Sequence, residues 1–135
     1  DLEANSTLVG VDSNNNGVRD DVERKLHSLF SDDARTFSVM LVGASAYQAS
    51  LLAGFSNNSV EVQKSLQQSS RFVSCYESIS EEFSDSFDFN NSLVEMLTLN
   101  TPERLEYRDK FLTLANGLTV ELMSVSDSDC IMESF

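Results

Sequence analysis

Residues 37–55, FSVMLVGASAYQASLLAGF, contain no charged side chain, and this run constrains the fold more than any other part of the sequence. The run predicts one long helix over roughly residues 33–54. A helix of this length nearly spans a bilayer. However, basic residues are missing on its C-terminal side, and polar residues interrupt it at Ser38, Ser45, Gln48 and Ser50. We therefore expect no transmembrane segment and interpret the run as the central helix of a core.

Small side chains recur along the same predicted helix, at Gly43, Ala46, Ser50 and Gly54. They predict that a neighbouring helix approaches closely. Ser31 and Asp32, just before the run, are candidates for its N-terminal cap.

Helical spacing of apolar residues predicts the remaining elements. Residues 20–30, DDVERKLHSLF, place Val22, Leu26, Leu29 and Phe30 on one face. A third helix begins at a capping box of Asn58 and Glu61 and continues to about residue 83. A short fourth helix covers residues 92–99. The phenylalanines of EEFSDSFDFN, which lies between them, are either an exposed binding segment or, as we expect, residues that close the core.

Thr101 followed by Pro102 is a strong start signal for the last helix, because the missing N–H of proline costs nothing at the first helical position. This helix bends or ends at Asn116 and Gly117. We therefore predict a single all-α domain of four to five helices over residues 1–135. The polar tail after it needs an anchor to stay ordered.

The chemical signal of the sequence lies in residues 11–23, VDSNNNGVRDDVE, immediately before the first helix. Calcium takes six to eight oxygen ligands, and a twelve-residue loop supplies them from positions 1, 3, 5, 7, 9 and 12. Here Gly17 occupies position 6, where the chain must turn sharply. The predicted ligands of residues 12–23 are Asp12, Asn14, Asn16, the carbonyl of Val18, Asp20 and Glu23. The alternative is an Asn/Gly-rich turn followed by an acidic helix cap.

This loop resembles the calcium loops of EF-hand proteins, and it is most similar to those of dockerin modules, thrombospondin type 3 repeats and small bacterial secreted proteins. Two departures matter. The segment STLVGV before the loop reads as extended, not as an entering helix. Arg19 occupies position 8, where paired EF-hands use an aliphatic residue to join a second loop, and the chain has no second loop. The resemblance therefore implies one structural calcium ion and not a paired sensor.

The two cysteines, Cys75 and Cys130, are buried thiols, a disulfide or members of a metal site. A Cys/His zinc site is disfavoured because His27 is the only histidine. Together with the calcium loop, the even cysteine count favours a disulfide and an oxidising compartment: secreted, periplasmic or cell-surface. Asp1 opens a polar segment without a visible signal peptide, which fits a mature, a cytosolic or a trimmed chain.

The net charge of the chain limits the classes of partner that it is expected to bind. Twenty-two acids against nine Lys and Arg give a net charge of −13, which repels nucleic acids and anionic membranes and favours cations and basic proteins. We do not expect an enzyme, because a nucleophile needs a base, and His27 lies at the boundary of a helix face. We expect an extracytoplasmic calcium-binding module that binds a protein partner. The alternative is a small secreted enzyme with an unlocated carboxylate site. Paired carboxylates such as Glu81–Glu82 and Asp127–Asp129 are too common in so acidic a chain to indicate that site.

Overall fold

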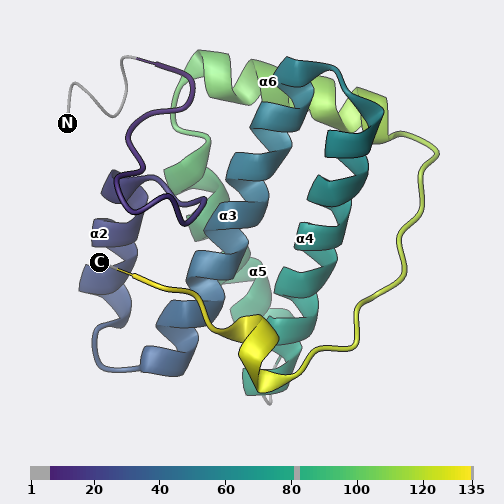
Figure 1. Ribbon diagram of the computed structural model, residues 1–135. Helices are drawn as coiled ribbons and strands as arrows, with labels where there is room; N and C mark the ends of the chain where they lie inside the picture. Colours follow the sequence, from purple (N-terminus) through teal and green to yellow (C-terminus); the bar gives the residue numbers. More distant parts are fainter. Residues whose placement is uncertain (1–6, 81–82, 135) are drawn as a thin grey trace.

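The computed structural model describes residues 7–80 and 83–134, with the backbone only for 83–85. These residues form a single all-α domain, which confirms the predicted class (Figure 1). Its five α-helices are α2 (Asp20–Phe30), α3 (Ala34–Ser56), α4 (Ser59–Ile79), α5 (Phe83–Thr98) and α6 (Pro102–Ala115), followed by a short 3-10 helix, η1 (Asp127–Cys130). Glu81 and Glu82 lie outside the described residues.

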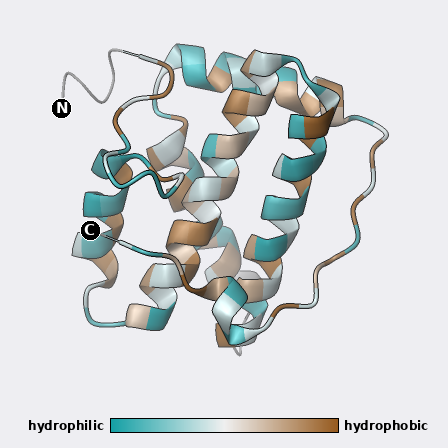
Figure 2. Ribbon diagram, viewed as in Figure 1, coloured by the Kyte–Doolittle hydropathy of each residue, from teal (hydrophilic) through white to brown (hydrophobic). Residues whose placement is uncertain are grey.

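Helix α3 is the central helix, as its uncharged sequence predicts, and it packs against α2, α4, α5 and α6. Its side chains at Met40, Leu41 and Leu51 are fully buried. Within the described residues α3 alone is long and apolar enough to cross a membrane, but 67% of that apolar stretch is buried inside the protein. In Figure 2 the apolar residues of α3 lie among the other helices and the polar residues of α2 face outward.

Two glycines of α3 explain how closely its neighbours pack. A methyl group at Gly54 would overlap the backbone carbonyl of Tyr107 in α6, which crosses α3 at this point. A methyl group at Gly43 would lie 2.7 Å from the ring of Phe72 in α4. The predicted close approach is therefore confirmed at two points along the helix.

The helix starts largely follow the sequence signals. Asn58 accepts hydrogen bonds from the backbone N–H of Val60 and Glu61 at the start of α4. Thr101 accepts one from Arg104 N–H at the start of α6. The cap of α3 is Asp33, not Ser31 or Asp32 as predicted, and its carboxylate accepts from Thr36 N–H.

Helix α5 is longer than predicted, because it begins at Phe83 and not at Ser92. Helix α4 correspondingly ends at Ile79, before the predicted limit at residue 83. The aromatic segment divides in two. Phe87 packs against the rings of Phe72 and Tyr76, with centroids 5.5 and 5.3 Å away, whereas Phe89 is 74% exposed. The expectation that these phenylalanines close the core holds for Phe87 and is wrong for Phe89, and the side chain of Phe83 lies outside the described residues.

Helix α6 ends at Ala115, and Gly117 after it has φ of +85°, which glycine adopts without strain. Leu118 and Leu122 follow the helix and are 45% and 59% exposed. The chain then runs alongside α4 (Figure 1), where Ser70 and Ser74 bind the backbone of Met123 at 2.8 and 2.6 Å.

The predicted disulfide joins Cys75 in α4 to Cys130 in η1, across 55 residues of sequence. It anchors the tail, which continues from η1 across the front of α3 toward α2 (Figure 1).

Candidate metal site in the loop before α2

The loop before α2 is closed by the side chain of its first predicted ligand. The carboxylate of Asp12 accepts hydrogen bonds from the backbone N–H of Asn16 at 3.2 Å and of Gly17 at 2.9 Å. Gly17 has φ of +85°, and Asn15 is also left-handed at +56°. Gly17 therefore occupies the sharp turn that the sequence pattern assigns to it.

The fifth and twelfth loop positions are brought into contact. Asn16 Oδ1 accepts from Val18 N–H at 3.0 Å, and Asn16 Nδ2 donates to Glu23 Oε1 at 2.7 Å. Glu23 lies in the first turn of α2 and is fully buried. The same turn carries Val22, which is 2% exposed, into the core.

Asp20, at the ninth loop position, makes hydrogen bonds through both its side chain and its backbone. Asp20 Oδ1 accepts from Ser13 N–H at 2.9 Å, and Asp20 N–H donates to Val11 O at 2.7 Å. Its side chain is buried, as is Val18 at the seventh position, whereas Asn14 at the third position is exposed. The loop thus closes as a compact turn.

The donor set suits calcium chemically, because every predicted ligand atom is an oxygen of a carboxylate, an amide or a carbonyl. The positions of these side chains fit a metal site less well than their chemistry does. Within residues 7–80 and 83–134, no three His, Cys, Asp or Glu side chains gather closely enough to hold a metal ion. Asp12 and Asp20 bond to backbone N–H groups of the loop, and Glu23 bonds to Asn16. The structure therefore brings the predicted ligands onto one loop without assembling them into a cluster.

Arg19, the unusual residue at loop position 8, is buried and ties the loop to the end of α5. Its guanidinium donates to Thr98 O at 2.7 Å and Leu97 O at 3.1 Å, two carbonyls at the end of that helix. It also donates to both carboxylate oxygens of Asp21, at 2.9 and 3.1 Å. Burial raises the pKa of Asp21, but the hydrogen bond and charge of Arg19 lower it, so the net pKa lies below the ordinary value.

A second buried arginine, Arg104 in α6, holds the segment before the loop. It donates to the backbone carbonyls of Thr7 at 3.0 Å and Leu8 at 3.1 Å, and to the side chain of Asn100 at 2.7 Å. Burial and the neighbouring charge of Arg19 lower the pKa of Arg104. The loop is therefore fixed on its N-terminal side by α6 and on its C-terminal side by α5.

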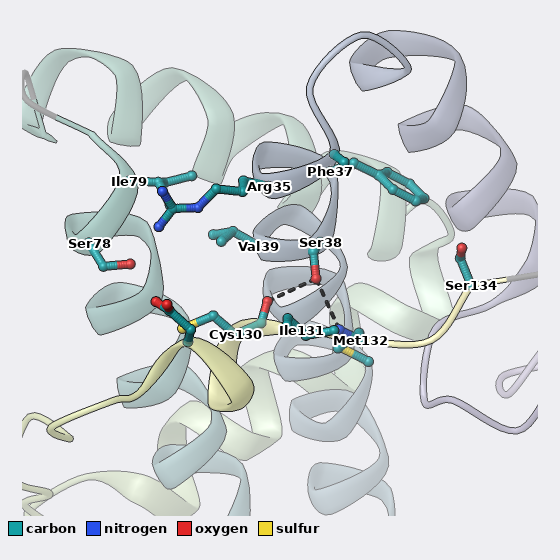
Figure 3. Close-up of a pocket in the computed structure, with 12 residues that line it drawn as sticks. Arg35, Phe37, Ser38, Val39, Ser78, Ile79, Cys130, Ile131, Met132 and Ser134 are labelled. Atoms are coloured by element: carbon teal, nitrogen blue, oxygen red, sulfur yellow. Dashed lines mark hydrogen bonds between the residues drawn. The ribbon is translucent and has the colours of Figure 1, made fainter.

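The C-terminal tail also contacts the loop. Asn16 Nδ2 donates to the backbone carbonyl of Glu133 at 2.8 Å, and Ser38 in α3 bonds to Cys130 O and Met132 N at 2.8 and 2.9 Å. The stretch from the disulfide to Glu133 is thus held at three points. Beside it lies a pocket of about 500 Å³ between α3, the end of α4 and the tail (Figure 3).

The sequence did not predict the hydrogen bonds of Arg19 and Arg104 or the contact between the tail and the loop. Arg19 carried a signal, since a charged residue stood where an aliphatic one is expected, but Arg104 and Asn100 carried none.

His27 lies on the surface with its ring edge-to-face against Phe37, 5.4 Å between centroids, in agreement with its predicted boundary position. Asp129 caps η1 through Ser126, with which its carboxylate bonds at 2.9 and 3.0 Å.

Comparison of the chain with protein-family models, with curated proteins and with solved structures found no match. The chemistry of the site therefore rests on its own residues.

Proposed function

We propose that this protein is an extracytoplasmic helical module that binds one structural calcium ion in the loop before α2 and presents a surface to a protein partner. The residues that would hold the ion are Asp12, Asn14, Asn16, the Val18 carbonyl, Asp20 and Glu23. Calcium would supply positive charge to three carboxylates of a strongly acidic chain.

The contact between Asn16 and Glu23 is the observation that carries this proposal. The Asn16 side-chain amide nitrogen lies 2.7 Å from Glu23 Oε1, so the side chains of the fifth and twelfth positions meet, and Glu23 is fully buried in the first turn of α2. Because Val22 and Leu26 carry the same helix into the core, ligation by Glu23 would link the order of the loop to the packing of α2.

Arg19 supports a structural ion over a paired sensor. In paired loops position 8 joins a second loop, but here the Arg19 side chain is committed to α5 and Asp21. The loop is therefore attached to the body of its own domain and does not need a partner loop. Such an attachment limits the opening movement on which sensors depend.

The disulfide between Cys75 and Cys130 supports the proposed location, because it is compatible with an oxidising compartment. Calcium reaches millimolar levels outside cells, where modules of low affinity are filled. We therefore propose a secreted, periplasmic or cell-surface protein.

Amide hydrogen exchange with calcium and with chelator tests the structural role. Calcium should slow exchange from Leu8 to about Leu26, while the middle of α4 stays protected in both conditions. Identical exchange profiles in the two conditions would contradict a structural ion. Turnover of any substrate that chelator abolishes would favour the alternative, a small secreted enzyme with a carboxylate site.

A further inference from the structure

The pocket beside the tail is mostly apolar and has the size of a small binding site. It occupies about 500 Å³ between the first turns of α3, the end of α4 and the tail, within the range of ligand pockets. Its apolar lining comes from all three segments and includes Phe37, Val39, Ile79, Ile131 and Met132 (Figure 3). Ile131 is 66% exposed although it borders this pocket.

The wall formed by the tail is held in place before any ligand arrives. Ser38 binds the backbone on both sides of Ile131, and the disulfide fixes Cys130 to α4. Asn16 donates to the backbone carbonyl of Glu133, the residue after Met132. A pocket with such walls loses little conformational entropy when it is filled.

The segments that supply two walls of the pocket are rich in acidic residues. The segments 31–35 and 126–134, which supply two of its walls, carry Asp32, Asp33, Asp127, Asp129 and Glu133. Among the lining residues, all in the described part of the chain, Asp127 is the one Asp or Glu and Arg35 is the one Lys or Arg. Arg35 extends from α3 toward Ile79 (Figure 3). The net charge of −13 has the same sign as this rim. The surroundings therefore attract positively charged segments and repel acidic ones.

We propose that this pocket receives a large apolar side chain from a basic segment of the partner protein. The apolar lining would desolvate the anchor, and the acidic rim would attract lysines or arginines on either side of it. This assignment rests on the proposed function, because it names the partner-binding surface of the same module.

The test uses two labelled peptides and the oxidised full chain in saturating calcium. The first peptide has one phenylalanine between pairs of lysines, and the second has glutamates in place of the lysines. Amide resonances of residues 38–39, 78–79 and 130–132 should shift with the lysine peptide. By fluorescence polarisation that peptide should bind about tenfold or more tightly than the glutamate peptide, and less tightly as salt increases.

Surface variants locate the binding energy without disturbing the core. Ile131→Asp should weaken binding of the lysine peptide by about tenfold or more, since it places a charge at the apolar lining. The matched control Leu122→Asp, also at an exposed apolar residue, should have no effect. Asp127→Lys should weaken binding a few-fold and Arg35→Glu should strengthen it a few-fold, about the range of rim charges.

Three outcomes would overturn the assignment: shifts confined to other faces, equal binding of the two peptides, or weaker binding in Arg35→Glu. The last would mean that Arg35 recognises an acidic group. A calcium titration of the same sample separates this result from the proposed function, because the peptide can fail while the loop still binds calcium. If calcium does not bind but the lysine peptide does, the pocket stands and the calcium proposal falls.

Discussion

Asn16 and Glu133 are 117 residues apart in sequence, yet the side-chain amide of Asn16 donates to the backbone carbonyl of Glu133 at 2.8 Å. The same amide nitrogen donates to Glu23 Oε1 at 2.7 Å. One proposed calcium ligand therefore holds both the exiting helix and the C-terminal tail.

This double contact allows the two roles of Asn16 to be separated. Asn16→Asp keeps side-chain oxygens at the fifth position but removes the amide donor, so calcium binding should persist while the tail loses its contact. Amide exchange at residues 132–134 should become faster, by about fivefold for a loss of about 1 kcal/mol. Asn14→Asp adds the same charge without touching the tail and should leave exchange there unchanged. Unchanged exchange in Asn16→Asp would show that the contact does not order the tail.

The hydrogen bonds of the Arg19 side chain should contribute strongly to the stability of the fold. Arg19→Met keeps an apolar side chain of similar length but leaves Asp21 and the carbonyls of Leu97 and Thr98 without this buried donor. We expect a loss of about 3 kcal/mol or more in the free energy of unfolding, measured by urea denaturation. Lys25→Met, at an exposed position in α2, is the control. A loss below about 1 kcal/mol would mean that water replaces the hydrogen bonds of Arg19.

The Arg19–Asp21 pair also predicts a pH dependence. The pKa of Asp21 lies below its ordinary value in the folded state, so the unfolded state binds more protons as the two forms titrate. The stabilisation is fully present above about pH 4 and is lost as pH falls through the folded-state pKa. The difference in melting temperature between wild type and Asp21→Asn should therefore shrink below pH 4. A difference that is constant across this range would contradict the charge interaction.

The disulfide should contribute about 4 kcal/mol, because it closes a loop of 55 residues in the unfolded chain. Replacing Cys75 and Cys130 together by serine should lower the free energy of unfolding by up to this amount. Native protein should also resist thiol alkylation. Two alkylated thiols in native protein would refute the bridge and weaken the proposed location with it.

The sequence predicted the fold where local signals agreed with packing. These signals are local in the sequence. They are the uncharged run of α3, the caps at Asn58 and Thr101, and the stop at Gly117. The start of α5 was missed because FSDSFDFN is rich in serine and acids, and its helix is supported by Phe87 against Phe72 and Tyr76, a contact between distant segments.

The candidate site was predictable only as far as its own loop. The turn at Gly17 and the meeting of Asn16 with Glu23 follow from spacing within residues 12–23. Arg104 contacts Leu8 across 96 residues of sequence and Glu133 contacts Asn16 across 117, so no local pattern reveals them. Only the three-dimensional packing brings these residues to the loop.

Calorimetric titration of the chelator-treated protein with calcium tests directly whether the loop before α2 binds the ion. We expect a single site with a dissociation constant of about 0.1–1 mM, at which about 2 mM calcium adds about 0.6–1.8 kcal/mol of stability. Glu23→Gln and Asp12→Asn should each abolish the binding heat or weaken affinity by about tenfold or more, since each removes one anionic ligand. The control Asp32→Asn, an exposed acid outside the loop, should titrate as wild type does. No saturable binding up to about 10 mM calcium, or equal affinity in wild type and Glu23→Gln, would contradict a calcium site in this loop.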